Sequence, residues 1–174
     1  MTISVLPDES LGMTDPANDR MTAQEYRAEH QSEEDIHKAV VDWADRQAAT
    51  EPALELLFHV PNGGSRHGAE AKKLRQMGVR QGVPDFLLPY AAQKSKWMDA
   101  NRYNGLALEL KSPSGRLRDT QKWWIRRLRE QGWAVAVAYG FDEAHHMIQR
   151  YLDGEHKEQG LDLSGAEPPR HVAE

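Results

Sequence analysis

Three charged residues in the middle of the chain have the types and spacing to do chemistry. Asp85 opens a short apolar run, while Glu109 and Lys111 follow another apolar run. Because side chains alternate across a β-strand, Glu109 and Lys111 should emerge on one face while Leu110 points to the other. Charges that leave an apolar strand on one side are costly unless they are paired or metal-bound. We therefore expect Asp85 and Glu109 to lie on neighbouring strands, around a divalent cation.

The chemistry that needs such a set is metal-assisted hydrolysis of a phosphodiester. Mg²⁺ and Mn²⁺ prefer oxygen ligands, which Asp85, Glu109 and the backbone carbonyl of Leu110 would supply. Lys111 would orient the attacking water and stabilise developing negative charge, and the two nearby anions favour its ammonium form. The alternative is a surface aspartate beside an exposed ion pair, because motifs this short also occur by chance.

Hydrophobic periodicity and turn residues predict the elements that must position these side chains. Helices are expected after Ser32, over Ala69–Met77, from Asp119 or Thr120 to Gly132, and over Phe141–Leu152. Strands are expected over Leu54–Val60, after Asp85, from Gly105 to Lys111, and over Trp133–Tyr139. The polar loop at 90–104 is either a substrate-contacting flap or a tolerated insertion.

Two further polar residues fall on inward helix faces. Glu33 lies three residues before Ile36 on the expected first helix, although acidic residues are also favoured in any first turn by the helix dipole. Glu34 is the fallback for this position. Gln121 falls on the buried stripe of its helix, where an amide needs partners; these are either the site itself or the local backbone.

The order of the motifs resembles one known nuclease family. The motifs are His59-Val60-Pro61-Asn62-Gly63-Gly64, Gly82-Val83-Pro84-Asp85-Phe86, Leu108-Glu109-Leu110-Lys111 and then Gln121. Over roughly residues 32–152 this pattern resembles the VRR-NUC family of the PD-(D/E)xK nuclease superfamily. The resemblance implies an α/β fold with a restriction-endonuclease-like αβββαβ core, in which a central mixed sheet is flanked by helices.

The resemblance also implies Mg²⁺- or Mn²⁺-dependent cleavage of DNA. By matching position, the active-site roles pass to Glu33, Asp85, Glu109, Lys111 and Gln121. His37 departs from the pattern, since the family often has Gln there. The family includes stand-alone members that resemble branched-DNA resolvases, and by that analogy a homodimer that cuts junctions or flaps is one expectation.

The distribution of charge suits a polyanionic substrate better than the net charge of −5 suggests. Residues 111–130 hold seven basic and two acidic residues, and residues 66–82 hold five basic and one acidic residue, so the local balances are +5 and +4. Basic segments beside a carboxylate site are what DNA requires, although ordinary solvated helix faces look alike. The expected DNA contacts are Asn62, Arg66, Lys72, Lys73, Arg80, Arg116, Arg118 and Lys122.

The remaining sequence predicts the organisation of the chain. We expect a flexible arm over residues 1–30, a nuclease domain over residues 31–153 and a disordered tail over residues 154–174. The sequence has no cysteine, no signal-peptide core and no apolar run long enough to span a bilayer, so a cytoplasmic protein is expected. Neighbouring His145 and His146 point about 100° apart on a helix, so surface histidines are expected rather than a metal pair.

Two rival functions belong to other classes. The first is a DNA-binding or recruitment module that keeps the fold without cleavage, which tight metal-independent DNA binding would support. The second is a metal-dependent hydrolase for a nucleotide or sugar phosphate. It would have a deep pocket instead of an open basic groove, and it would cleave small phosphodiesters but not DNA.

Overall fold

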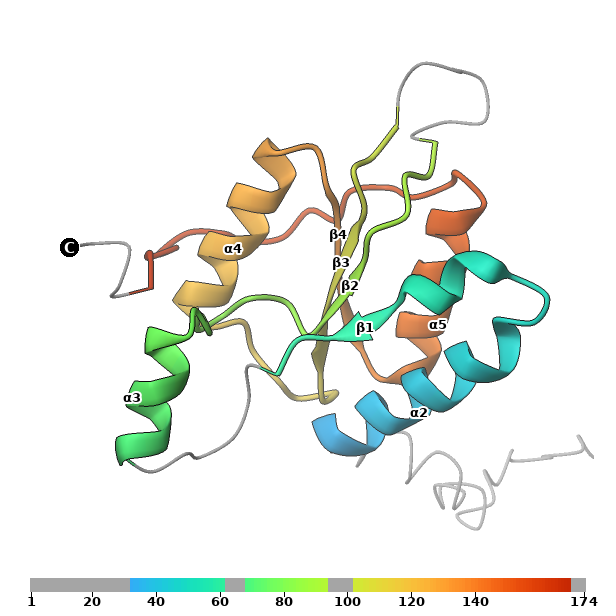
Figure 1. Ribbon diagram of the computed structural model, residues 1–174. Helices are drawn as coiled ribbons and strands as arrows, with labels where there is room; N and C mark the ends of the chain where they lie inside the picture. The colour runs from blue at the N-terminus through green and yellow to red at the C-terminus, as the bar shows by residue number, and fades with distance from the viewer. Residues whose placement is uncertain (1–31, 62–67, 94–101, 170–174) are drawn as a thin grey trace, which may run out of the picture.

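A four-stranded mixed sheet lies between helices in a computed structural model, which describes residues 32–61, 68–93 and 102–169 (Figure 1). In chain order the elements are α2 (Glu33–Gln47), the 3₁₀ helix η2 (Pro52–Leu56), β1 (Phe58–His59), α3 (Gly68–Gln76), β2 (Phe86–Leu88), β3 (Leu106–Lys111), α4 (Asp119–Glu130), β4 (Ala134–Tyr139) and α5 (Phe141–Leu152). The expected arm over residues 1–30 lies outside the described residues.

The strands follow each other in the sheet in chain order. β1 pairs antiparallel with β2, β2 pairs antiparallel with β3, and β3 pairs parallel with β4. The parallel pair needs a crossover, which α4 provides. Phe86 of β2 lies opposite Leu108 of β3, so Asp85, one residue before Phe86, lies level with Glu109.

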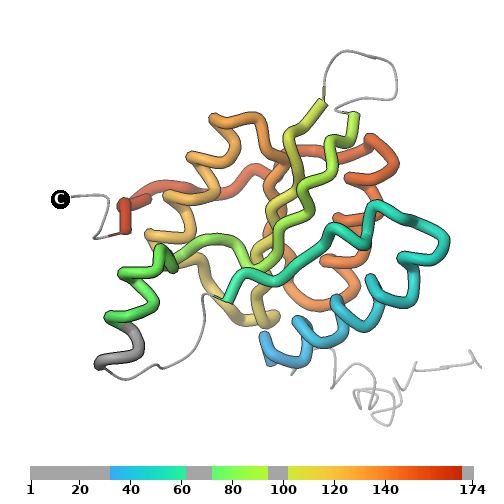
Figure 2. The backbone as a smooth tube through the Cα atoms, viewed as in Figure 1, coloured from blue at the N-terminus to red at the C-terminus, as the bar shows by residue number. Residues whose placement is uncertain are grey.

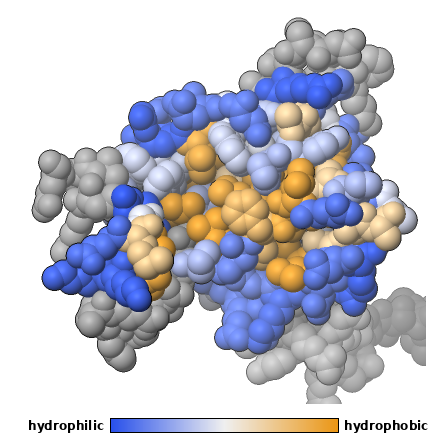
Figure 3. Space-filling view, viewed as in Figure 1, coloured by the Kyte–Doolittle hydropathy of each residue, from blue (hydrophilic) through white to orange (hydrophobic). Residues whose placement is uncertain are grey.

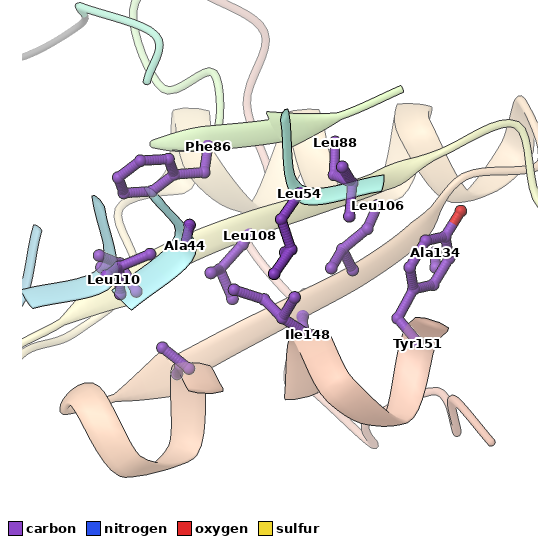
Figure 4. Packing of buried hydrophobic residues seen from close by; sticks show 14 of the residues in the cluster. Ala44, Leu54, Phe86, Leu88, Leu106, Leu108, Leu110, Ala134, Ile148 and Tyr151 are labelled. Carbon is purple, nitrogen blue, oxygen red and sulfur yellow. The ribbon is translucent and has the colours of Figure 1, made fainter. Parts of the chain in front are cut away.

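Helices α2 and α5 cover one face of the sheet and α4 covers the other (Figure 1). Figure 4 shows Leu106 and Leu108 of β3 pointing into the core toward Ile148 of α5, and Leu110 belongs to the same core cluster. The alternate residue Ala107 packs instead with Ile125 of α4. The fold class expected from the sequence, a mixed sheet flanked by helices, is confirmed.

The expected strand over Leu54–Val60 is much shorter in the structure. Residues Pro52–Leu56 form a 3₁₀ helix, and only Phe58 and His59 pair with β2. Pro52 occupies the start of the helical turn, where its fixed φ is suited and its missing N–H is not needed. At the other end of β1, Pro61 cannot donate to a ladder, so pairing stops there.

The segment after α5 follows a defined path up to residue 169, which differs from the disordered tail expected for residues 154–174. Its chain passes along α4 (red in Figure 2), where Arg126 donates to the Leu163 carbonyl and Arg129 to the Gln159 carbonyl. The Gln159 amide accepts from Val137 N at 2.7 Å and donates to Val137 O at 2.9 Å. This side chain satisfies backbone groups that β4 leaves unpaired as an edge strand, which polar composition alone does not reveal.

The hairpin of β2 and β3 continues outward as a bridge between Gln93 and Arg102. The expected flap, residues 94–101 of the loop, lies outside the described residues. Among the described helices, none combines the length and the apolar character that a bilayer crossing requires.

His156 should make stability depend on pH. Its side chain is buried against Tyr103 and Tyr151, its Nε2 has no hydrogen-bond partner, and burial lowers its pKa. The unfolded chain therefore takes up a proton near pH 6.5 that the folded chain resists. We expect the contribution of His156 to the free energy of unfolding to fall as the pH drops below about 6.5, so His156→Phe should gain free energy of unfolding relative to the unaltered chain as the pH is lowered. Urea unfolding at pH 7.5 and 5.5, with the exposed His146→Phe as control, measures this slope.

Candidate active site

Four elements bring the sequence-predicted site residues together. Asp85 lies just before β2, Glu109 and Lys111 lie at the end of β3, and Gln121 lies in the first turn of α4. Glu33 begins α2. Glu109 and Lys111 share one face of β3, while Leu110 joins the core on the other face, as strand alternation predicts.

The Lys111 ammonium is buried and held by three oxygens. Its Nζ donates to Glu109 Oε1 at 2.5 Å and to the Leu110 carbonyl at 2.8 Å, and it lies 3.5 Å from Glu33 Oε1. Only 3% of its side chain is exposed. A buried ammonium without such partners would be very costly. The structure also separates Glu33 from Glu34, since Glu34 points to solvent and pairs with Lys38.

Glu109 is a buried carboxylate with one unused oxygen. Oε1 accepts from both Lys111 Nζ and Gln121 Nε2, whereas Oε2 is buried without a hydrogen-bond partner. Burial, and then the nearby charge of Asp85, raise the pKa of Glu109 to about 8. A cation bound at Oε2 would stabilise the charged form of the Glu109 carboxylate.

Gln121 makes both of the contacts that its position predicts. Its Nε2 donates to Glu109, and its Oε1 accepts from Arg118 N at 2.9 Å at the start of α4. The residue is 3% exposed. The amide therefore caps its own helix and holds one oxygen of Glu109 at the same time.

Asp85 is tied to both neighbouring strands through its side chain and its backbone. Its Oδ2 accepts from Leu110 N at 2.8 Å, and its carbonyl accepts from Val60 N at 2.8 Å. Its Oδ1 lies 3.6 Å from His37 Nε2. The carboxylate is one-fifth exposed, so it borders solvent beside the buried Glu109.

Two histidines stand beside Asp85 that sequence reasoning did not place in the site. His37 and His59 lie with ring centroids 4.8 Å apart, and His59 Nδ1 lies 2.9 Å from the Asp85 carbonyl. The available signal was spacing, because His37 lies four residues after Glu33 and so shares its helix face. The sequence had marked His37 only as a departure from the family pattern.

The residues present fit a hard divalent cation. Two carboxylates and the Leu110 carbonyl supply oxygen ligands of the type that Mg²⁺ and Mn²⁺ prefer, and the partnerless Oε2 of Glu109 is the observation that favours a cation there. Within the described part of the chain, no cluster of three or more His, Cys, Asp or Glu side chains is arranged to hold a metal. A cation would therefore depend on a backbone oxygen, waters and substrate to complete its shell.

The residues expected to contact DNA differ in their exposure and in their partners within the protein. Lys72, Lys73, Arg116 and Arg118 are exposed, and Arg80 is half-buried and donates to the Arg75 carbonyl. Lys122 instead donates to the Ser164 carbonyl and lies 3.4 Å from Asp119, so the C-terminal segment occupies it. Asn62 and Arg66 lie outside the described residues. His146 is exposed on α5, and His145 stacks on Phe141.

Gly82 sets the distance between the Asp85 loop and α4. Its φ is +81°, and a Cβ built on it would lie 2.7 Å from Thr120 backbone and side-chain atoms. We expect Gly82→Ala to lower the free energy of unfolding by about 2–5 kcal/mol, from strained backbone and overpacking. Gly78→Ala is the matched control, since Gly78 has φ +97° but open space around it, and about 1–2 kcal/mol is expected. Equal losses in urea unfolding would show that the contact with Thr120 does not matter.

Comparisons with known proteins identify the family of this chain. The model of the VRR-NUC domain family, a nuclease-type domain, matches residues 18–142. A solved structure described as a VRR_NUC domain protein is similar, with a TM-score of 0.57 and 26% sequence identity over 74% of this chain and 93% of that chain. No curated protein matches the sequence. Since the family model spans well over half of the chain, this chain belongs to the VRR-NUC domain family.

Proposed function

We propose that this chain is a divalent-metal-dependent deoxyribonuclease that hydrolyses phosphodiester bonds. One observation carries the proposal: Lys111 is held against Glu109 at the end of β3, while Glu109 keeps a buried oxygen without a partner. A purely structural ion pair would leave no such oxygen, because buried polar atoms are normally satisfied. Membership of a nuclease-type family supports the same activity.

Each residue has a distinct role in this proposal. Asp85, Glu109 and the Leu110 carbonyl would hold Mg²⁺ or Mn²⁺, which supplies Lewis acidity and a more acidic bound water. Gln121 fixes Oε1 of Glu109, which leaves Oε2 for a ligand. Lys111 donates toward the negative charge that develops on the phosphate, and Glu33 Oε1, 3.5 Å from its Nζ, helps hold the ammonium in place.

The substrate is proposed to be DNA because Arg118 lies near enough to Glu109 to act on its charge, and further exposed basic residues lie on the described elements. Lys72 and Lys73 lie on α3, and Arg116 and Arg118 lie between β3 and α4. These side chains would bind phosphates, so affinity should fall steeply as salt rises. We also propose a homodimer, since two symmetric sites suit a two-stranded substrate, and the mass of the protein in solution tests it.

The direct test is cleavage of supercoiled plasmid and of branched or flapped DNA in Mg²⁺, in Mn²⁺ and in EDTA. Metal-dependent nicking that EDTA stops is the expected result. Tight DNA binding without cleavage in either metal would instead favour the non-catalytic binding module. Cleavage of small phosphodiesters but not of DNA would favour a different hydrolase.

A further inference from the structure

An apolar pocket lies between the end of β1 and the turn that follows α3. Its volume is about 290 Å³, close to the ~300 Å³ at which small-ligand pockets begin. Aliphatic side chains form most of the lining that the described residues supply, and Arg80 is the one charged residue among them. The lining that matters here consists of Val60, Pro61, Met77, Val79 and Val83.

Met77 stands at this pocket with 70% of its surface exposed, more than any other large hydrophobic residue described. Hydrogen bonds hold it there: its N–H donates to the Lys73 carbonyl, and Val79 N donates to the Leu74 carbonyl across the turn. Single exposed hydrophobic residues are common and need no explanation alone. An exposed methionine on a hydrogen-bonded turn, in the lining of an apolar pocket, is a different arrangement, because both surfaces would be buried by one apolar ligand.

The positive charge around this pocket indicates that the apolar ligand is part of a polyanion. Residues 72–84 contain four basic residues and no acidic residue, and Lys72, Lys73 and Arg75 are exposed. Figure 3 shows hydrophobic residues bordered by the hydrophilic surface of α3 in this region. A nucleic acid combines a phosphate backbone with flat bases whose faces are apolar, which matches this pairing of cations and apolar surface.

Two lining residues link the pocket to Asp85 of the candidate active site, one by a hydrogen bond and one by its position in the sequence. Val60, in its lining, donates its N–H to the Asp85 carbonyl at 2.8 Å. Val83, also in the lining, lies two residues before Asp85. A base in this pocket would therefore lie close to the phosphate that the site is proposed to cleave.

We propose that Met77 is an apolar wedge that separates a base step of DNA beside the scissile phosphate, and that this pocket receives the displaced base. The inference rests on the proposed function, whose substrate it refines. Apolar side chains inserted between bases unstack them at a cost of a few kcal/mol per step. DNA whose bases are already unstacked, at a flap, branch or mismatch, avoids that cost and is the preferred substrate.

The test separates base displacement from cleavage. Duplexes carrying 2-aminopurine at successive positions along one strand are bound in Ca²⁺, which we use to hold back cleavage, and the fluorescence of the unstacked base is measured. The full-length chain should raise the fluorescence at one position. Met77→Ala should remove this rise, and Met77→Leu, which keeps an apolar wedge, should restore it.

Cleavage rates supply the second measurement. We expect Met77→Ala to cut intact duplex roughly ten- to a hundredfold more slowly, and to cut mismatched or single-stranded DNA at nearly the normal rate. The matched control is Leu56→Ala, an exposed hydrophobic residue of η2 at the other end of β1. It should change neither readout.

The outcomes distinguish this inference from the proposed function. Equal fluorescence and equal duplex cleavage in Met77→Ala and the unaltered chain would overturn the wedge while leaving the nuclease intact. Equal slowing on duplex and on single-stranded DNA would also overturn it, because a wedge acts only on stacked bases. A fluorescence rise that needs Met77, in a protein that cuts no DNA in Mg²⁺ or Mn²⁺, would support the wedge and reject the nuclease.

Discussion

Lys111→Met should slow DNA cleavage by about a thousandfold, the scale of losing a preorganised charge donor at a transition state. Lys111 is the one ammonium in contact with Glu109 among the described residues, and its position is fixed by Glu109, Leu110 and Glu33. Initial rates of plasmid nicking at saturating Mg²⁺ measure the effect. Lys111→Arg keeps the charge in a different shape and should recover only part of the rate.

Stability must be followed in the same variant, because Lys111 also neutralises a buried carboxylate. Removing one partner of a buried pair costs about 3–5 kcal/mol when the other stays charged. Glu109 can avoid that cost by binding a proton, so the loss of stability should be small at pH 6 and larger at pH 9. Lys38→Met, an exposed lysine paired with Glu34, is the matched control. A rate within tenfold of normal in Lys111→Met would remove this residue from the mechanism.

Asp85→Asn should abolish metal-dependent cleavage, with a loss of at least about a thousandfold, while leaving the fold intact. The Asn carbonyl can still accept the hydrogen bond from Leu110 N that Asp85 Oδ2 accepts at 2.8 Å. What it removes is one of the two carboxylate charges proposed to hold the cation. Mn²⁺ binding by calorimetry and plasmid nicking measure the two consequences separately.

Asp85→Asn should also change the pKa of the neighbouring Glu109. The charge of Asp85 helps raise the pKa of Glu109, so Asp85→Asn should lower that pKa from about 8. A raised carboxyl pKa means that the folded chain binds a proton that the unfolded chain releases, so stability falls as the pH rises from about 4.5 to 8. In Asp85→Asn this fall should end at a lower pH and be smaller in total. The exposed Asp42→Asn on α2 is the control, and unchanged Mn²⁺ affinity in Asp85→Asn would contradict the assignment.

Most of the fold was predictable because its elements carry strong local signals. The helix Phe141–Leu152 was predicted at its observed limits, and Ser32 caps α2 by accepting from Asp35 N, as expected of an N-cap. The elements that differ are a strand that neighbouring prolines interrupt and a segment whose path depends on distant partners. β1 is cut to two residues by the prolines around it, and residues 154–169 are positioned by α4 and the edge of β4.

The candidate site also has features that local sequence predicts and features that only the tertiary structure shows. Strand alternation was sufficient to place Glu109 and Lys111 on one face of β3, opposite Leu110. It could not show that Asp85 hydrogen-bonds to Leu110 N, or that His37 and His59 stand beside Asp85. These contacts join residues from separate elements, and their distances depend on how the helices pack on the sheet.

The order of the motifs indicated the family by resemblance, and the resemblance implied the mixed α/β fold, while strand alternation and helical periodicity placed Glu109, Lys111 and Gln121 on the faces that meet at the end of β3. Alternation and periodicity act through local backbone geometry, which repeats in every helix and strand. Only the tertiary structure decided which oxygen of Glu109 lacks a partner, that Glu33 rather than Glu34 faces Lys111, and that the C-terminal segment occupies Lys122. Those features depend on burial and on contacts across long sequence separations, where desolvation decides which charges need partners.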